Sequence, residues 1–260
     1  MTHYPHLLLD IQQHTALVTI SNPPANTWNA DSLNGLIELV HELNANRDIY
    51  ALVLTGEGSK FFSAGADLNM FADGDPAVAR KMARLFGQAF ETLTDFRGVS
   101  IAAINGYAMG GGLECALACD IRIAEEQAQM ALPEAAVGLL PCAGGTQNLP
   151  WLVGEGWAKR MILCGERVNA ETALRIGLVE EVVPKGQARE RALALALQAE
   201  KQSPSSVAAS KQLIQGARHN PLGTILQTER ELFVDLFDTQ DQKEGVNAFL
   251  EKRAPSWKNA

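Results

Sequence analysis

The sequence has little positive charge. Its 22 Lys and Arg residues stand against 30 Asp and Glu residues, which gives a formal net charge of −8. A dedicated nucleic-acid binder normally carries a basic face that neutralises phosphates, so this charge disfavours that class of function. The sequence also lacks an apolar run long enough to cross a membrane, and its first residues lack the pattern of a signal peptide. We therefore expect a cytoplasmic protein that binds neither nucleic acid nor membranes.

Cysteine and histidine are scarce and poorly placed for metal or hydrolytic chemistry. The four cysteines form no Cys-x-x-Cys pair and have no histidine nearby at metal-ligand spacing. We therefore predict no metal site and no disulfide framework. A Ser-His-Asp hydrolase would need a histidine in the central region. All five histidines lie near the ends of the chain or on a predicted helix surface.

Nucleotide-binding loops are absent as well. The sequence contains no Gly-x-x-x-x-Gly-Lys-Ser/Thr motif, and no Gly-x-Gly-x-x-Gly follows a predicted strand. These two loops are how many proteins hold nucleotide phosphates, so the sequence disfavours a kinase or a dinucleotide-dependent dehydrogenase.

Short apolar strands alternate with amphipathic helices in the first half of the chain. After a predicted hairpin, strand-then-helix units cover residues 16–43, 51–93 and 99–118. Asn29 or Asp31 is suited to cap the first helix. The recurrence of such units favours an α/β fold built by winding similar units.

Beyond Pro184 the pattern is almost purely helical. Helices are predicted over residues 188–202, 206–217, 221–237 and 242–252. The later helices carry more apolar residues, including Phe233 and Phe237, than a lone appendage can bury. We therefore divide the chain into a core with the active site over residues 1–200 and a helical oligomerisation region over residues 201–260.

Three consecutive glycines, ending at Gly112, lie between a predicted buried strand at 99–104 and an apolar helix at 113–118. The first amides of a helix have no intrahelical partner and lie at the positive end of its dipole, so such a turn can hold an anion or a developing oxyanion. The alternative is a tight turn whose glycines only let strand and helix pack closely. Glu114 favours the functional interpretation, because it is the only charge on a helix otherwise made of Leu, Cys and Ala.

Two further segments are predicted to be loops whose backbone groups are free to contact a ligand. Residues 60–68 are small and flanked by aromatics, which indicates a loop whose backbone approaches a ligand, or else a plain connector. Residues 140–146 form another glycine-rich loop. Between them, Glu134 directly follows Pro133 and is predicted in the first turn of a short helix or in a turn.

Together, two glycine-rich turns and two separated glutamates indicate a site for carbonyl chemistry. Two backbone amides aimed at a thioester oxygen would stabilise an enolate, and a carboxylate with a tuned pKa could then move a proton at the neighbouring carbon. If Glu114 and Glu134 meet across one substrate, they can position a water between them. The alternative is that the glutamates belong to structural ion networks.

Several motifs carry a specific resemblance. They are Phe62-Ser63-Ala64-Gly65-Ala66-Asp67-Leu68, Asn105-Gly106-Tyr107-Ala108-Met109-Gly110-Gly111-Gly112-Leu113-Glu114, the segment from Leu132-Pro133-Glu134 to Gly144-Gly145-Thr146-Gln147, and the end from Glu231 to Phe249-Leu250-Glu251-Lys252-Arg253. In order and spacing the sequence resembles the enoyl-CoA hydratase/isomerase (crotonase) family, with enoyl-CoA hydratase as its closest type. The resemblance implies a spiral of strand-strand-helix units with a helical C-terminal region that assembles trimers or hexamers.

The same resemblance implies roles for individual residues. The amides of Ala66 and Gly111 would hold the thioester oxygen of an enoyl-CoA. Glu114 would bind and deprotonate a water, and Glu134 would orient it and supply a proton to C2. No cofactor is implied, since coenzyme A is part of the substrate. Further substrate or coenzyme A contacts are implied at Ala25, Asn26, Trp28, Ala64, Asp67, Leu68, Gly110, Pro133 and Cys142, with Phe233 and Lys252 from a neighbouring subunit.

The sequence departs from the family pattern at a few positions. Cys142 stands where hydratases usually have glycine, Asn69 stands where a lysine that contacts coenzyme A is common, and Trp28 adds bulk near the acyl or pantetheine path. Both glutamates are present, so hydration of the 2,3 double bond to give a 3-hydroxyacyl-CoA is the leading hypothesis. Double-bond isomerisation, decarboxylation and, with less support, RNA binding without catalysis remain alternatives.

Overall fold

The computed structural model describes residues 4–260, so residues 1–3 of the predicted core lie outside it. Its main sheet has the strand order β1-β2-β3-β5-β7-β10. The first two strands form the predicted antiparallel hairpin, and every later neighbour pairs in parallel. The strands are β1 (Leu7–Gln12), β2 (Thr15–Ile20), β3 (Ala51–Gly56), β5 (Val99–Ile104), β7 (Ile121–Glu125) and β10 (Glu181–Val183).

A second, smaller sheet has the order β4-β6-β8-β9. Its strands are β4 (Phe61–Ser63), β6 (Tyr107–Met109), β8 (Gln129–Ala131) and β9 (Val168–Asn169). The first three follow β3, β5 and β7 along the chain, so each long strand leads into a short strand and then a helical segment. This confirms the strand-strand-helix fold. The prediction of a loop throughout residues 60–68 was wrong at Phe61–Ser63, where pairing with β6 makes a strand.

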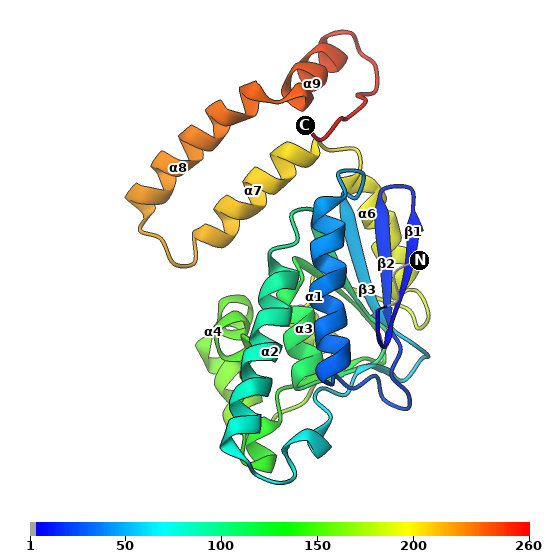
Figure 1. Cartoon of the computed structure of the whole chain (residues 1–260), viewed down its shortest axis with the longest axis vertical. Helices are drawn as coiled ribbons and strands as arrows, with labels where there is room; N and C mark the ends of the chain where they lie inside the picture. Colours follow the sequence, from blue (N-terminus) through cyan, green and yellow to red (C-terminus); the bar gives the residue numbers. More distant parts are fainter. Residues whose placement is uncertain (1–3) are drawn as a thin grey trace.

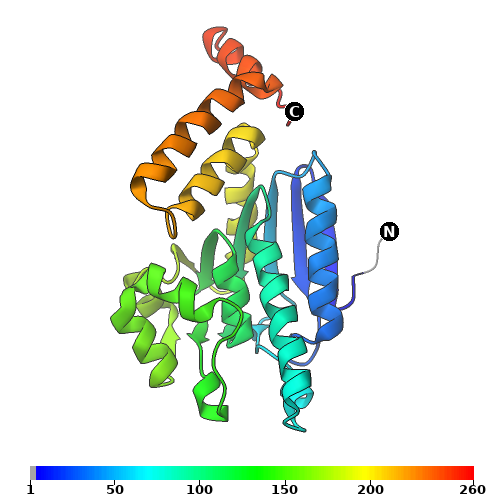
Figure 2. The ribbon, with the colours of Figure 1, turned by 60° about the vertical axis from the view of Figure 1, so that its left-hand side comes forward.

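Helices cover both faces of the main sheet. Alternate residues of β3 face opposite sides: Leu52 and Leu54 join the larger core cluster, and Val53 packs in a second cluster with Ala192 of α6. Figures 1 and 2 show α1 and α2 side by side over one face. The helices of this part are α1 (Ala30–Ala45), α2 (Pro76–Thr94), α3 (Gly111–Ala118), α4 (Gly145–Leu163), α5 (Ala170–Arg175) and α6 (Ala188–Ala199).

The predicted helix starts follow from their capping residues. Asn29 caps α1, and its side chain accepts a hydrogen bond from the Ser32 amide while the Ser32 hydroxyl accepts one from the Asn29 amide. Asp75 caps α2 through the amide of Ala77 and precedes the proline that opens the helix. Short 3₁₀ helices occur at η1 (Leu68–Phe71), η2 (Glu134–Val137) and η3 (Leu236–Asp238).

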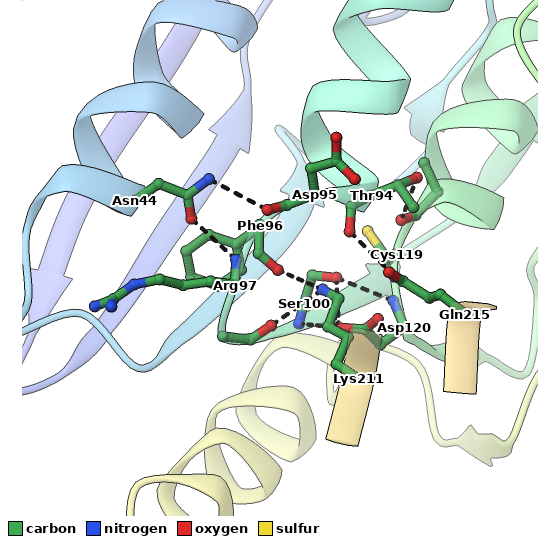
Figure 3. Close-up of polar contacts among 12 residues, drawn as sticks. Asn44, Thr94, Asp95, Phe96, Arg97, Ser100, Cys119, Asp120, Lys211 and Gln215 are labelled. Carbon is green, nitrogen blue, oxygen red and sulfur yellow. Dashed lines mark hydrogen bonds and ion pairs between the residues drawn. The ribbon is translucent and has the colours of Figure 1, made fainter. Parts of the chain in front are cut away.

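The last helices project from one end of the core (Figures 1 and 2). They are α7 (Pro204–Gly216), α8 (Leu222–Asp235) and α9 (Gln240–Leu250). Figure 3 shows how Lys211 of α7 reaches the core: its Nζ donates to the carbonyls of Phe96 and Gly98 and lies 2.8 Å from Oδ2 of Asp120. Asp120 in turn accepts from the amide and hydroxyl of Ser100. One cation thus fastens α7 to the loops that precede β5 and β7.

None of the helices in residues 4–260 is long and apolar enough to span a bilayer. Large apolar side chains are nevertheless exposed on the projecting helices. They include Leu222, Phe233, Val234, Phe237, Val246, Phe249 and Leu250.

Candidate active site

The glycine-rich turn begins α3 two residues earlier than predicted, at Gly111. Gly110 precedes the helix with φ of 51°, a conformation that L side chains rarely adopt, and its amide donates to the carbonyl of Ala131 at 2.9 Å. This bond holds the turn against the small sheet. The Gly111 amide is therefore the first amide of a helix, where no intrahelical acceptor exists.

A second backbone segment lies against this turn. Gly65 has φ of 94°, and a Cβ built on it would lie 2.6 Å from the Met109 carbonyl oxygen, so only glycine fits. Hydrogen bonds from the Trp28 amide to the Gly65 carbonyl and from the Asp67 amide to the Trp28 carbonyl hold the segment in place. Between them, the Ala66 amide has no acceptor in the part of the chain that the structure describes.

The two amides come close together. A Cβ built on Gly111 would lie 3.7 Å from the Ala66 nitrogen and 3.8 Å from the Gly65 Cα. Both are ordinary van der Waals distances. The same Cβ would also lie 3.2 Å from Cε1 of Phe86. The geometry brings together the two segments from which the sequence predicted an oxyanion hole.

Glu114 lies in the first turn of α3 and is only 3% exposed. Its Oε1 accepts hydrogen bonds from the amides of Ala143 (2.8 Å) and Gly145 (2.9 Å). Burial raises the pKa of this carboxyl, and the two amides oppose the rise by stabilising the charged form. A Cβ on Gly145 would lie 2.9 Å from the same oxygen, so a glycine lets this backbone approach the carboxylate.

Glu134 begins η2, as its predicted place after Pro133 allows. Its Oε2 is buried without a hydrogen-bond partner among residues 4–260. Burial raises the pKa of Glu134 to about 7, and the charge of Glu114 adds to the rise. A Cβ on Gly110 would lie 3.1 Å from the Glu134 Oε1, so this carboxyl faces the glycine-rich turn.

All four predicted catalytic residues line one cavity of about 270 Å³. The cavity also contains Ala64, Leu68, Gly110, Pro133 and Cys142, which the sequence assigned to substrate binding. Partial desolvation, and after it the charges of Glu114 and Glu134, raise the pKa of the Cys142 thiol to about 11. Its side chain therefore meets the substrate space as a neutral thiol.

The other predicted binding residues lie outside this cavity. Trp28 is fully buried and packs edge-on against Phe90, so its bulk belongs to the core. Asn26 is buried and donates to the carbonyls of Glu57 and Phe61. The other positions are Ala25, whose carbonyl accepts from the Ala64 amide, Asp67, which caps η1 and accepts from Asn69, and Phe233 and Lys252 in or just after the projecting helices.

Sequence reasoning missed some residues of the site. Phe86 lies on the buried face of α2 and also lines the cavity. Ala143 and Gly145 bind Glu114 through backbone amides, for which the glycines of loop 140–146 were the visible signal. The wall also includes Gly65, Phe71, Ala136, Val137, Leu139 and Leu140, none of which the sequence assigned to substrate binding.

Within residues 4–260 no group of three or more His, Cys, Asp or Glu side chains is placed to hold a metal ion. The site consists instead of two backbone amides, two carboxyls of unequal environment and an apolar wall. These groups suit the binding and polarisation of a carbonyl next to a carbon that exchanges a proton.

The fold and the site define the class: an α/β enzyme with the strand-strand-helix spiral of the crotonases. The sequence profile of the family described as enoyl-CoA hydratase/isomerase matches residues 10–260, and the chain belongs to this family of enzymes. The predicted resemblance is thereby confirmed.

Individual relatives agree with this assignment. The chain is 40% identical to the 2,3-dehydroadipyl-CoA hydratase of Escherichia coli, over 97% of this chain and 98% of that protein. It is 38% identical to the short-chain-enoyl-CoA hydratase of Clostridium acetobutylicum, over 95% of each. Among solved structures, DspI from Pseudomonas aeruginosa superposes with a TM-score of 0.96 at 71% identity, covering 99% of this chain and 98% of that chain.

Proposed function

We propose that the protein adds water across the 2,3 double bond of a 2-enoyl-CoA to give a 3-hydroxyacyl-CoA. The observation that carries the proposal is the meeting of Glu114 and Glu134 in one cavity with the amides of Ala66 and Gly111. A reaction that only moved a double bond would need one proton carrier, whereas hydration uses a base for the water and an acid for carbon.

The two amides bind the thioester oxygen. As hydroxide adds to C3, charge moves onto this oxygen, and two preset amides stabilise the enolate better than the ground-state carbonyl. In comparable oxyanion holes one such donor contributes about 3 kcal/mol to lowering the barrier. Ala66 and Gly111 each contribute a backbone amide, so a side chain introduced elsewhere in the chain cannot take over this hydrogen bond.

The glutamates divide the proton transfers. The amides of Ala143 and Gly145 occupy Oε1 of Glu114, which leaves Oε2 to bind the water and accept its proton as oxygen bonds to C3. Glu134, with a pKa of about 7, is partly protonated near neutral pH and donates its proton to C2. Exchange with solvent returns the proton from Glu114 to Glu134 after product leaves.

The proposed partner is a second copy of the same chain. Exposed apolar side chains of α8 and α9, among them Phe233 and Phe249, form a surface that a monomer leaves in water. We expect a trimer or a dimer of trimers, with Phe233 and Lys252 of one subunit near the substrate of another. We also expect the protein to work in the cytoplasm.

The proposal is tested with crotonyl-CoA and longer 2-enoyl-CoAs. Hydration removes the conjugated enoyl absorbance and adds the mass of one water to the product. Isomerisation to a 3-enoyl-CoA also lowers the absorbance but leaves the mass unchanged, and decarboxylation cannot occur because these substrates carry no free carboxylate. No loss of absorbance with any chain length would refute the proposed hydration.

A further inference from the structure

We propose that the cavity selects an uncharged aliphatic acyl chain and discriminates against an enoyl-CoA that carries a second carboxylate. The inference rests on the proposed function and names its substrate class. Family membership leaves this choice open, because relatives of similar identity are named for the dicarboxylic 2,3-dehydroadipyl-CoA and for short-chain enoyl-CoAs.

The first observation is the composition of the cavity wall. Among the described residues that line it, Glu114 and Glu134 are the charged ones, and none is Lys, Arg or His. The rest of the wall is glycine, alanine, proline, large apolar side chains and Cys142. A distal carboxylate would therefore leave water for a wall that offers no cation from its own subunit, at a large desolvation cost. The neighbouring subunit's Lys252 is expected at the coenzyme A groove and not at this wall.

The second observation concerns the wall that follows Glu134. Val137, Leu139 and Leu140 of η2 and the next loop line the cavity and remain exposed, as does Leu68. Exposed apolar side chains gathered around a cavity mark a binding surface. An alkyl chain extending from C3 past the glutamates would cover these side chains and remove them from water.

The third observation is electrostatic. Glu114 and Glu134 lie close enough for the charge of Glu114 to raise the pKa of Glu134. A third carboxylate in the same cavity would meet both, and like charges in a partly buried site repel more strongly than in water. Desolvation and repulsion therefore act in the same direction against a diacid.

The test compares two substrates that differ in one group. The acid is 5-carboxypent-2-enoyl-CoA, and its methyl ester has nearly the same length without the charge. At about pH 8 we expect kcat/KM for the ester to exceed that for the acid by at least about 100-fold, since the site has no partner for the buried carboxylate.

Substitutions at Leu140 test whether the wall from Val137 to Leu140 sets the preference for an uncharged acyl chain. Leu140→Arg supplies a cation at an exposed position and is expected to raise the acid-to-ester ratio of kcat/KM by about 10-fold or more. Leu140→Gln is polar but uncharged and should not raise it. The control is Leu163→Arg, which adds the same charge at the end of α4, where Leu163 is 68% exposed and outside the cavity.

The outcomes separate the two proposals. If the ester and other neutral enoyl-CoAs are hydrated and the acid reacts equally well, the inference is overturned while the hydratase function stands. If Leu140→Arg leaves the ratio at its native value, the wall from Val137 to Leu140 does not contact the acyl chain. If no enoyl-CoA is hydrated, the proposed function itself fails.

Discussion

Glu134 is a half-buried residue whose Oε2 is buried and lacks a partner among the described residues, and its pKa is raised to about 7. Such a group weakens the folded state whenever it is charged, which is a common cost of a catalytic site. The same feature makes it an effective acid near neutral pH. At the scale of single residues, stability and proton donation are therefore coupled in one side chain.

The coupling predicts a pH-dependent effect of Glu134→Gln. The ordinary pKa of a glutamate is 4.5, and the pKa of Glu134 in the folded protein is about 7. Between these two pH values the folded protein keeps a proton that the unfolded chain has released. Stability therefore falls as pH rises through this window, and the loss is complete above the folded pKa. Glu134→Gln should raise Tm at about pH 8 and have little effect through this mechanism near pH 4. Thermal unfolding scans test it, with Glu38→Gln on the exposed face of α1 as control; a Tm gain independent of pH would contradict the coupling.

Gly111 allows a second prediction. In Gly111→Val the new side chain begins 3.2 Å from Phe86 and extends into the space between the two amides. We expect kcat/KM for enoyl-CoA hydration to fall by at least about 100-fold, while overpacking costs about 1–3 kcal/mol of unfolding free energy. The control is Gly156→Ala, where an added Cβ has no atom within 4 Å. Near-native turnover by Gly111→Val would remove the oxyanion role of this turn.

At the scale of elements, α7 depends on one largely buried cation, Lys211. The Lys211 and Asp120 side chains are 11% and 22% exposed, and Lys211 also serves two carbonyls (Figure 3). Lys211→Met removes the donor to both carbonyls and the charge partner of Asp120, which keeps its bonds from Ser100, and should lower the unfolding free energy by about 2–3 kcal/mol. Lys159→Met breaks the exposed pair with Glu155, 61% and 77% exposed, and should cost under about 1 kcal/mol. Chemical denaturation measures both, and equal losses would show that the α7 anchor is no stronger than a surface pair.

Elements differed in how well the sequence predicted them. The spacing of Leu33, Leu36, Ile37 and Val40 predicted α1 because its apolar face alternates with polar residues over a long segment. The strands of the small sheet were not predicted, because two or three residues carry too little periodicity. They exist through pairing with distant segments, as Tyr107 pairs with both β4 and β8.

The sequence predicted those parts of the candidate site whose residues stand out within their own segment. Glu114 and the glycines of its turn are unusual within their own segment, so the sequence revealed them. The cavity wall at Leu139 and Leu140 resembles any apolar loop, and only the fold places it beside the glutamates. Trp28 lies near a motif and was assigned to the substrate path. Its side chain is buried in the core, and a substrate contact there stays a prediction.

At the scale of the whole molecule, the projecting helices predict self-association. Phe249 is 83% exposed near the end of α9, and burial of a phenylalanine contributes about 2–3 kcal/mol. Phe249→Glu should shift the protein from an oligomer toward monomer in analytical ultracentrifugation. Leu163→Glu, at an exposed position of α4, should leave the assembly unchanged. A native protein that sediments as a monomer would refute the assembly.

The central claim is that Glu114 delivers water to C3 of an enoyl-CoA. Its most direct test is hydration of trans-2-enoyl-CoA in heavy-oxygen water by the native protein and by Glu114→Gln, followed by mass spectrometry of the product. We predict one heavy oxygen, carried on C3, with the native protein, and a rate lower by at least about 100-fold with the variant. Unlabelled product, or equal labelling rates for the two proteins, would contradict the account.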